Sequence, residues 1–278
     1  MSRRERILIA MSGGVDSSLA AALLVETCAE VIGVTMRLVA GGSRCCSLDD
    51  AEDARRVADG LGIRFYVADY ADAFRREVME PFADAYLAGR TPIPCIACNR
   101  RFKFKHLMER AHALGASAVA TGHYARIATG ADERPRLLRA RDLTKDQSYF
   151  LFDLDAGQLA RIRFPLGELT KDEVRARARE LGLATADKPE SQEICFVPDG
   201  NVGDAVARLR PGLAPGGGDV VDAAQRVVGR HDGIHRFTVG QRRGLAVALG
   251  ERVYVTGIDA AQNRVRIGTA DALLAQAA

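Results

Sequence analysis

Hydrophobic residues in the first two thirds of the chain form short apolar runs that alternate with amphipathic segments. The apolar runs predict strands over residues 7–11, 30–39, 64–70 and 116–123. The segments between them predict helices over about 17–27, from 47 onward, 71–88 and 104–115. Strands separated by helices of this length pair in parallel through right-handed crossovers. We therefore expect an α/β fold built on a doubly wound parallel sheet.

The pattern changes near residue 200. Short β-like runs then follow one another, separated by glycine-rich turns such as PGGGD; they are DVVDA, RVVGR, HRFTVG, ERVYVTGID and NRVRIG. This part of the chain predicts a small, mostly β module. We expect one domain over residues 1–199 and a second over 200–278.

Two helix starts carry capping signals. Ser47 and Asp50 have the spacing of a capping box, and so do Thr170 and Glu173. Gly182 follows the second segment and is expected to end its helix.

Composition limits the class of protein. The chain has 278 residues, 47% of them hydrophobic, which is enough for a large core. No run of about 18 apolar residues occurs, and the N-terminus lacks the features of a signal peptide, so we expect a cytoplasmic protein with no membrane partner. Six cysteines are too sparse for a disulfide scaffold, and Cys28 is expected to be a packing residue.

Charge is informative only locally, because 39 basic residues nearly balance 36 acidic ones, for a net charge of +3. Basic residues gather in three stretches: Arg100, Arg101, Lys103, Lys105, His106 and Arg110; Arg134, Arg136, Arg139, Arg141 and Lys145; and Arg226, Arg230, His231, His235, Arg236, Arg242 and Arg243. Each is either a solvated face or a surface for nucleic acid.

The segment ILIAMSGGVDSSLAAALL reads as a strand, a glycine turn and a helix. Gly13 and Gly14 allow an anion to approach the backbone, and the helix start supplies amides and the positive end of a dipole. The segment has neither G-x-G-x-x-G nor G-K-[ST]. Asp16 suits a Mg²⁺ ion held on a pyrophosphate. The sequence predicts a phosphate-binding loop of neither the dinucleotide nor the Walker type.

The stretch TPIPCIACNRRFKFK places Cys95 and Cys98 three positions apart, before a basic and aromatic arm. A zinc knuckle, a redox pair and a sulfur-handling site all begin with C-x-x-C, and the spacing leaves these alternatives open. Phe102 and Phe104 are candidates for stacking on nucleic-acid bases.

Several motifs in order carry a resemblance to a known family. The string S-G-G-x-D-S resembles the loop of enzymes that cleave ATP between the α- and β-phosphates. The further strings GRTPIPCIACNRRFKF, ATGHYARI, KDQSYFLF, KPESQEICFVPDG and HRFTVGQRRGL closely resemble the tRNA-specific 2-thiouridylases. These enzymes replace the C2 oxygen of the wobble uridine of tRNA by sulfur.

The resemblance implies an adenine nucleotide α-hydrolase-like sheet and a sulfurtransferase that uses ATP and Mg²⁺. It implies a tRNA substrate of the Lys, Glu or Gln type, adenylation of uracil O2, and then attack of sulfur at C2. The sulfur would come from a donor protein, either a cysteine desulfurase or a persulfide relay. The family's usual C-terminal β-barrel is expected to be absent from this chain.

The resemblance also assigns residues. ATP contacts are implied for Ala10, Met11, Ser12, Gly13, Gly14, Val15, Asp16, Ser17, Met36 and Gly122. Contacts to tRNA are implied for His123, Lys145, Asp146 and Gln147. Cys195 would carry the persulfide, and Cys98 would attack or resolve it through a transient Cys98–Cys195 disulfide. Asn99 and the segment 92–94 would shape a pocket for a flipped uridine.

The chain departs from the family at two positions. Cys95 stands where many members have Asp, which leaves the general base in doubt, and Ile93 replaces an Asn. Three thiolates, Cys95, Cys98 and Cys195, could hold a [4Fe–4S] cluster with one iron open to hydrosulfide, so a cluster is an alternative to persulfide transfer. The partial match around Cys45 and Cys46 indicates no role.

Two other classes of function remain. An ATP-dependent synthetase acting on a small molecule would use the same loop, but it would not need paired thiols beside basic residues. A non-catalytic RNA- or metal-binding module would use C-x-x-C and the arginines, but it would not need the phosphate loop.

Overall fold

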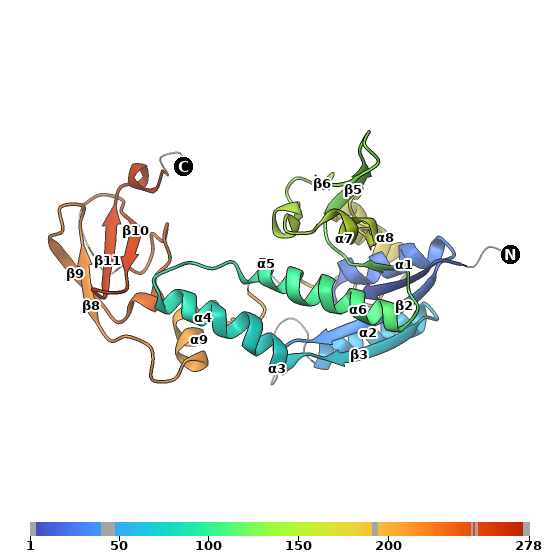
Figure 1. The fold of residues 1–278 in the computed structure, drawn as a ribbon, viewed down its shortest axis with the longest axis horizontal. Helices are drawn as coiled ribbons and strands as arrows, with labels where there is room; N and C mark the ends of the chain where they lie inside the picture. Colours follow the sequence, from blue (N-terminus) through green and yellow to red (C-terminus); the bar gives the residue numbers. More distant parts are fainter. Residues whose placement is uncertain (1–3, 40–47, 191–193, 246, 248–249, 275–278) are drawn as a thin grey trace. The chain divides into compact units, whose positions relative to one another are not determined.

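The structure, a computed structural model, describes residues 4–39, 48–190, 194–245, 247 and 250–274. The chain divides into two compact units (Figure 1). Unit 1 consists of Met1–Arg75 and Cys95–Phe196, and unit 2 consists of Arg76–Pro94 and Val197–Ala278. Unit 2 therefore includes a segment from the first half of the chain, which the sequence pattern did not indicate.

Unit 1 is built on a parallel sheet, as predicted. The described strands lie in the order β3-β2-β1-β4-β7 and pair in parallel throughout. Their bounds are β1 Arg6–Ala10, β2 Glu30–Arg37, β3 Arg64–Asp69, β4 Ala118–Ala120 and β7 Ile162–Arg163. The inner strands β1 and β2 are buried along most of their length, because helices cover both faces of the sheet.

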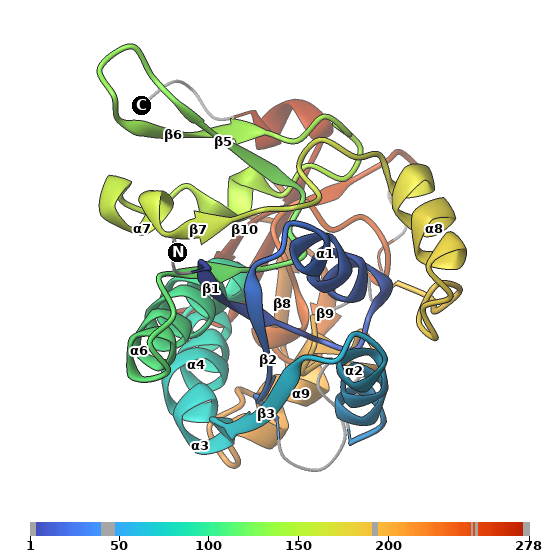
Figure 2. The same ribbon diagram turned by 90° about the vertical axis from the view of Figure 1, so that its right-hand side faces the viewer.

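Helices α1 (Val15–Glu26), α2 (Leu48–Gly60) and α8 (Lys171–Glu180) cover one face of the sheet, and α6 (Leu107–Ala113) covers the other (Figure 2). The first face is a single apolar core in which Ile7 and Ile9 pack with side chains of these three helices. The predicted cap of α8 is confirmed, since Thr170 and Glu173 form both bonds of a capping box. The other predicted cap residue, Ser47, lies outside the described residues.

The helix predicted over 104–115 begins earlier. It consists of α5 (Pro94–Cys98), a π-helical stretch (Asn99–His106) and α6, so Cys95 and Cys98 lie on its first turn. The helix predicted over 71–88 is present as α3 (Ala71–Phe74), a second π-helical stretch (Arg75–Met79) and α4 (Glu80–Leu87).

Several short elements of unit 1 were not predicted. They are the hairpin of β5 (Ala125–Thr129) and β6 (Pro135–Arg139), a 3₁₀ turn (Ser148–Leu151) and α7 (Ala156–Ala160). The hairpin connects the end of β4 to the 3₁₀ turn, so residues 140–148 return to the side of the sheet where β4 ends. These elements, together with the sheet and its helices, position the side chains of the site described below.

The second part of the chain is mostly β, as predicted. Unit 2 has a sheet in the order β10-β11-β8-β9, in which β8 and β11 are parallel and the other pairs are antiparallel. The strands are β8 Gly218–Val221, β9 Val227–His231, β10 Tyr254–Asp259 and β11 Arg264–Gly268. The run HRFTVG, expected to be β-like, instead contributes to a 3₁₀ turn at Ile234–Arg236, and Phe237 anchors it in the core.

Unit 2 also contains two helical elements. α9 (Val202–Leu209) packs against α4, and a 3₁₀ turn (Ala270–Leu273) follows β11. Arg210 joins α4 to the end of α9 through ion pairs with Glu80 at 3.1 Å and Asp84 at 2.7 Å. The Tyr86 hydroxyl lies 3.2 Å from Thr238 Oγ1. These contacts explain why Arg76–Pro94 belongs to this unit.

None of the helices in the described part of the chain combines the length and the apolar character that a membrane crossing needs.

Candidate nucleotide and sulfur-transfer site

The loop between β1 and α1 requires glycine at position 13. Gly13 has φ +72°, which is in the left-handed region. A Cβ atom there would also lie 2.1 Å from the carbonyl oxygen of Asp50. Any side chain would therefore push the loop away from the first turn of α2.

Hydroxyl groups fix the shape of this loop. The Ser12 amide donates to Ser17 Oγ at 3.1 Å, and Ser17 Oγ donates to the Gly14 carbonyl at 3.2 Å. Ser18 Oγ donates to the same carbonyl at 2.9 Å. Gly14 is the N-cap of α1 and has no side chain to occupy the first amides of the helix. The loop thus presents a helix N-terminus of the kind that binds phosphate.

The end of β4 lies directly against the loop. A Cβ atom at Gly122 would lie 2.7 Å from the Ser17 nitrogen and 2.8 Å from the Asp16 carbonyl carbon. Glycine is therefore needed at position 122, where the carboxyl ends of strands β1 and β4 meet. Ligands bind at such strand ends in folds of this type. Met36, expected at the adenine, is buried in β2 with 6% of its surface exposed.

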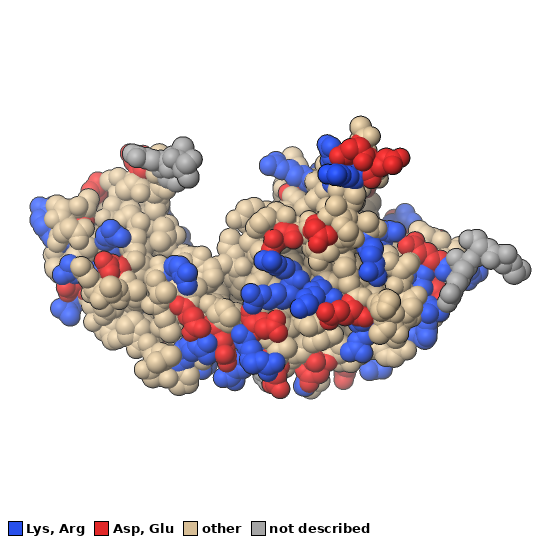
Figure 3. Space-filling view, viewed as in Figure 1, with Lys and Arg blue, Asp and Glu red and all other residues tan. Residues whose placement is uncertain are grey.

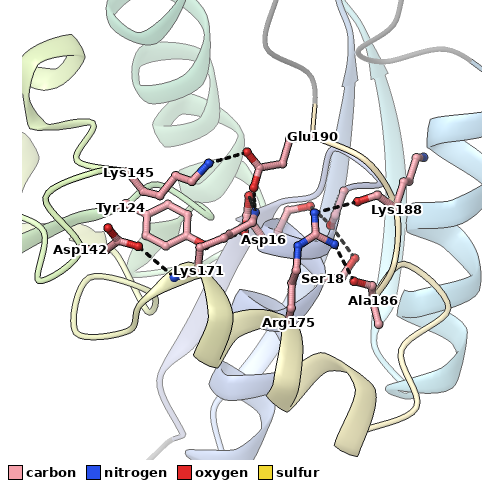
Figure 4. Close-up of polar contacts among 12 residues, drawn as sticks. Asp16, Ser18, Tyr124, Asp142, Lys145, Lys171, Arg175, Ala186, Lys188 and Glu190 are labelled. Atoms are coloured by element: carbon pink, nitrogen blue, oxygen red, sulfur yellow. Dashed lines mark hydrogen bonds and ion pairs between the residues drawn. The ribbon is translucent and has the colours of Figure 1, made fainter.

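Four charged side chains form an alternating row beside the loop (Figure 4). The Lys171 ammonium contacts Asp16 Oδ1 at 2.7 Å and Oδ2 at 2.9 Å, and it contacts Glu190 Oε1 at 2.8 Å. Lys145 Nζ lies 2.7 Å from the other oxygen of Glu190. The Tyr124 hydroxyl donates to Asp16 Oδ1 at 2.8 Å. Asp16 is thus already engaged by a cation and a hydroxyl group.

Burial and charge shift the ionisation of this row. Burial alone would raise the pKa of Glu190, but hydrogen bonds from Lys145 and Lys171 outweigh it and lower that pKa to about 2. Burial, followed by the negative charge of Asp16, raises the pKa of the Tyr124 hydroxyl far above its usual value. At neutral pH, Glu190 is therefore an anion and Tyr124 a neutral hydrogen-bond donor.

Sequence reasoning missed Lys171, Glu190 and Tyr124. One signal was available, since Lys171 is the first residue of α8, where a positive charge opposes the helix dipole. A buried lysine at a helix start needs anionic partners. The partner Asp16 lies 155 positions earlier in the chain, so the local sequence does not identify it.

The three candidate sulfur-site cysteines differ in exposure. On α5, Cys95 is exposed and Cys98 is buried, whereas Cys195 is half-buried and directly precedes Phe196, the last residue of unit 1. Among the described residues, no group of three or more His, Cys, Asp or Glu side chains has an arrangement that could hold a metal. Cys28 is exposed, so the expectation that it packs in the core was wrong. Cys45 and Cys46 lie outside the described residues.

The candidate tRNA contacts already have partners within unit 1. His123 is buried, with Thr121 Oγ1 2.7 Å from its Nδ1. The Asp146 carboxylate accepts hydrogen bonds from the Ala140 amide at 2.9 Å and from the Ser148 hydroxyl. Gln147 Oε1 accepts from the Tyr124 amide at 3.0 Å. Asp146 and Gln147 therefore shape the turn that presents Lys145.

The three basic stretches have different surroundings. In the third, which lies in unit 2, three arginines pair with nearby carboxylates and both histidines are buried; the pairs are Arg226–Asp222, Arg230–Asp219 and Arg236–Asp204. In the second, Arg136, Arg141 and Lys145 pair with Asp132, Glu173 and Glu190. Many of these charges are neutralised locally.

The first basic stretch forms a visible group of Lys and Arg side chains over the helix that begins with α5 (Figure 3). Arg101, Lys105 and Arg110 are exposed there. Phe102 and Phe104 are fully buried, so their expected role in stacking on bases was wrong. Phe102 packs on Phe74 instead.

The uridine-pocket candidates lie near this helix start. Asn99 is buried, and its side-chain amide donates to the Phe150 carbonyl at 3.2 Å. Its oxygen has no hydrogen-bond partner among the described residues. Ile93 is 41% exposed.

Comparisons with known proteins agree on one family. Residues 5–199 match the model of a tRNA methyl transferase HUP domain, and residues 209–269 match that of a tRNA methyl transferase PRC-barrel domain. The chain is 51% identical to the tRNA-specific 2-thiouridylase MnmA of Caulobacter sp. strain K31, over 98% of this chain and 68% of that protein. It is also 51% identical to the MnmA of Geobacter metallireducens, over 98% of this chain and 76% of that protein.

The chain belongs to the tRNA-specific 2-thiouridylase family. Among solved structures, a 4-thiouridine synthetase–RNA complex with bound ATP has a TM-score of 0.49 and 18% identity, covering 75% of this chain and 51% of that one. NMN synthetase from Francisella tularensis has a TM-score of 0.43 and 21% identity, covering 68% of this chain and 67% of that one.

Proposed function

We propose that this chain is an ATP-dependent sulfurtransferase that 2-thiolates the wobble uridine of tRNA. Membership of the 2-thiouridylase family is the observation that carries the proposal. The loop geometry at Gly13, Gly14 and Gly122 supports the ATP site, and the cysteines at positions 98 and 195 supply sulfur-reactive side chains.

The first half of the proposed reaction activates the base. Uracil O2 attacks the α-phosphate of ATP, the bond to the β-phosphate breaks, and pyrophosphate leaves. The amides and hydroxyls around residues 12–17 hold the phosphates. The O2-adenylated uracil then has a good leaving group at C2.

The second half transfers sulfur. The terminal sulfur of a persulfide on Cys195 attacks C2, and AMP leaves with the former O2. Cys98 then attacks the sulfur of Cys195, which releases thiouridine and leaves a Cys98–Cys195 disulfide. A cellular thiol reductant must supply two electrons to reset the pair, and a donor protein must reload Cys195.

Magnesium fits beside the loop under one condition. Asp16 carries the carboxylate suited to a Mg²⁺ ion on pyrophosphate. Lys171 and Tyr124 contact this carboxylate, so a bound ion would have to share it with a cation and a hydroxyl group. When bound, Mg²⁺ would neutralise charge on the pyrophosphate that leaves.

The described cysteines do not fit an iron–sulfur cluster. They do not form a three-ligand group with other metal-binding side chains, and Cys95 is exposed whereas Cys98 is buried. No step of the proposed thiolation reaction therefore uses a cluster. Iron analysis of anaerobically purified protein checks this, because a cluster would contribute about four irons per chain.

The Cys195→Ser variant tests the function. We expect it to release pyrophosphate with tRNA, ATP and Mg²⁺ but to form no thiouridine, because adenylation does not use the thiol. Mass spectrometry of digested tRNA and a pyrophosphate assay measure the two steps. Cys28→Ser, which changes an exposed cysteine, is the matched control and should thiolate normally. Normal thiolation by Cys195→Ser would refute the assignment.

We also propose that tRNA binds over the basic helix that begins with α5. Phosphate contacts release counterions, so the affinity should fall steeply as salt rises, with a slope of about 0.7–0.9 per contact. Lys105→Gln should reduce the magnitude of the slope of log K against log salt by about 0.7–0.9, the contribution of one phosphate contact. Arg226→Gln, which removes a cation already paired with Asp222, should leave the slope unchanged. A flat salt dependence in the unmodified protein would exclude this surface.

A further inference from the structure

Two aromatic side chains of unit 1 are exposed to solvent just after the candidate tRNA contacts in the chain. Tyr149 is 61% exposed and Phe152 is 64% exposed, and they are the two most exposed aromatic side chains in the described part of the chain. Hydrated apolar surface is unfavourable, and contiguous exposed apolar surface is typical of binding sites. The pair is therefore a candidate binding surface.

The backbone places both rings on one side of the same turn. Tyr149 lies in the 3₁₀ turn Ser148–Leu151, and Phe152 follows it with φ −60° and ψ −21°, so it continues the 3₁₀ geometry. Side chains three positions apart eclipse each other in a 3₁₀ helix, about 6 Å apart along its axis. Tyr149 and Phe152 thus form one exposed surface, which we call the aromatic face.

The turn beneath the aromatic face is anchored in unit 1. The Gln147 amide donates to the Tyr124 carbonyl at 2.9 Å, and the Phe150 amide donates to the Gln147 carbonyl at 3.0 Å. Leu151 is buried. The Tyr149 ring makes a T-shaped contact with the Phe150 ring, with 5.6 Å between their centroids. The exposed rings are therefore carried by a bonded backbone with a buried neighbour.

The aromatic face adjoins the basic helix that begins with α5. The Asn99 side-chain amide donates to the Phe150 carbonyl at 3.2 Å. The Arg100 guanidinium lies 3.0 Å from the carboxylate of Asp153, the residue that follows the face. Asn99 and Arg100 come directly after Cys98 in the chain. Two contacts thus join the aromatic face to the helix that carries this cysteine and the exposed cations.

The chemistry of this surface suits unpaired nucleic-acid bases. Proteins that bind single strands combine cations for the phosphates with rings on which bases of any kind stack. Bases in single-stranded loops are free to stack in this way. A uridine that leaves its stack also uncovers the faces of its neighbours. The wobble uridine lies in such a loop, so its neighbours meet both conditions.

We propose that Tyr149 and Phe152 stack on unpaired anticodon-loop bases next to the target uridine of tRNA. The inference rests on the proposed function and adds a base-binding surface to it. These rings take the role that the sequence suggested for Phe102 and Phe104, which are buried. Stacking releases no counterions, so the aromatic face contributes affinity that is nearly independent of salt, whereas the cations beside it contribute the salt-dependent part.

The first test is the affinity of the full chain for tRNA at several salt concentrations. The double variant Tyr149→Leu with Phe152→Leu keeps apolar side chains and removes both rings. We expect it to bind about tenfold more weakly at every salt concentration, with an unchanged slope of log K against log salt. Lys105→Gln should instead change the slope. Tyr149→Phe keeps a ring and should bind normally.

Crosslinking supplies a second readout, which a purely structural role of the rings would not give. An anticodon stem-loop RNA carrying 5-iodouridine at the position before the wobble uridine is bound and irradiated. Iodouracil crosslinks to aromatic side chains stacked on it. Mass spectrometry should place the crosslink at Tyr149 or Phe152 in the unmodified protein, and the double leucine variant should lose it.

Tyr66→Leu is the matched control. Tyr66 is 43% exposed and lies in β3, an edge strand of the parallel sheet of unit 1. Its substitution should leave affinity, slope and crosslink unchanged. Normal tRNA affinity in the double leucine variant would overturn the inference, even if thiolation with a persulfide donor protein fell, because the face would then bind that protein. A reduced slope would also overturn it, since the basic helix would be disturbed. Thiouridine formation by the unmodified chain tests the proposed function separately.

Discussion

His123 shows how burial decides the chemistry of a single side chain. Its imidazole is packed near Phe104 and Phe164, and Thr121 is its hydrogen-bond neighbour. Burial, and then the nearby charge of Lys103, lowers its pKa well below the ordinary value. If His123 contacts tRNA as the family resemblance implies, it does so at neutral pH through a hydrogen bond of a neutral ring rather than by attracting phosphate.

This low pKa predicts a loss of stability in acid. The folded state holds His123 neutral, whereas the unfolded chain protonates it below about pH 6.5, so the unfolded state binds more protons. The stabilising contribution is complete above that pH and is lost as pH falls, by at most about 1.4 kcal/mol per pH unit.

Urea unfolding at about pH 7.5 and about pH 5.5 measures the effect. The unmodified chain should lose more stability over this interval than His123→Gln, which lacks the titrating ring. His231 and His235 also have lowered pKa values and remain in both proteins, so the difference isolates His123. An equal loss in both proteins would show that burial of this ring does not shift its titration.

At the scale of elements, α8 combines a structural cap with a side chain that contacts the phosphate loop. Thr170 caps the helix, and the next residue is Lys171. Thr170→Ala should cost about 1 kcal/mol of unfolding free energy, because it leaves the Glu173 amide without its side-chain acceptor. Urea unfolding measures this cost.

Thr269→Ala is a suitable control for the cap. Thr269 precedes a 3₁₀ turn of unit 2 and makes no side-chain capping bond there. Its substitution should change stability by less than about 0.5 kcal/mol. If both variants lose the same free energy, the capping box contributes nothing specific.

Sequence patterning predicted the elements whose signal lies within a short stretch of chain. β1 and β2 are apolar along most of their length because both faces of a parallel sheet are covered. The capping box at Thr170 was predictable because its two residues are three positions apart in the chain. The sequence pattern did not indicate the π-helical turns near Phe102. Phe102 and Phe104 pack there on Phe74 and Phe164, which come from other parts of the chain. The run HRFTVG alternates like a strand, but Phe237 packs it into the core without strand pairing.

At the scale of the whole molecule, the phosphate loop and the cysteine motifs could be recognised because each is local in sequence. The charged row could not be recognised, because Lys171 contacts a carboxylate 155 positions earlier, and Lys145 contacts one 45 positions later. Such pairs depend on the sheet order, which brings the ends of β1 and β4 together. The charged row therefore becomes recognisable only once the fold is known.

The divided course of unit 2 has a consequence for the chain as it leaves the ribosome. The residues Phe82, Ala83 and Tyr86 of α4 are buried in the folded protein, and Arg210, which pairs with Asp84, comes 126 positions later. At about 5–20 residues per second, roughly 100 intervening residues take about 5–20 s to synthesise. During that time unit 1 can be completed while the apolar face of α4 has no unit 2 partner. Nascent chains of this protein should therefore bind chaperones that recognise exposed apolar helices, until residues after 197 emerge.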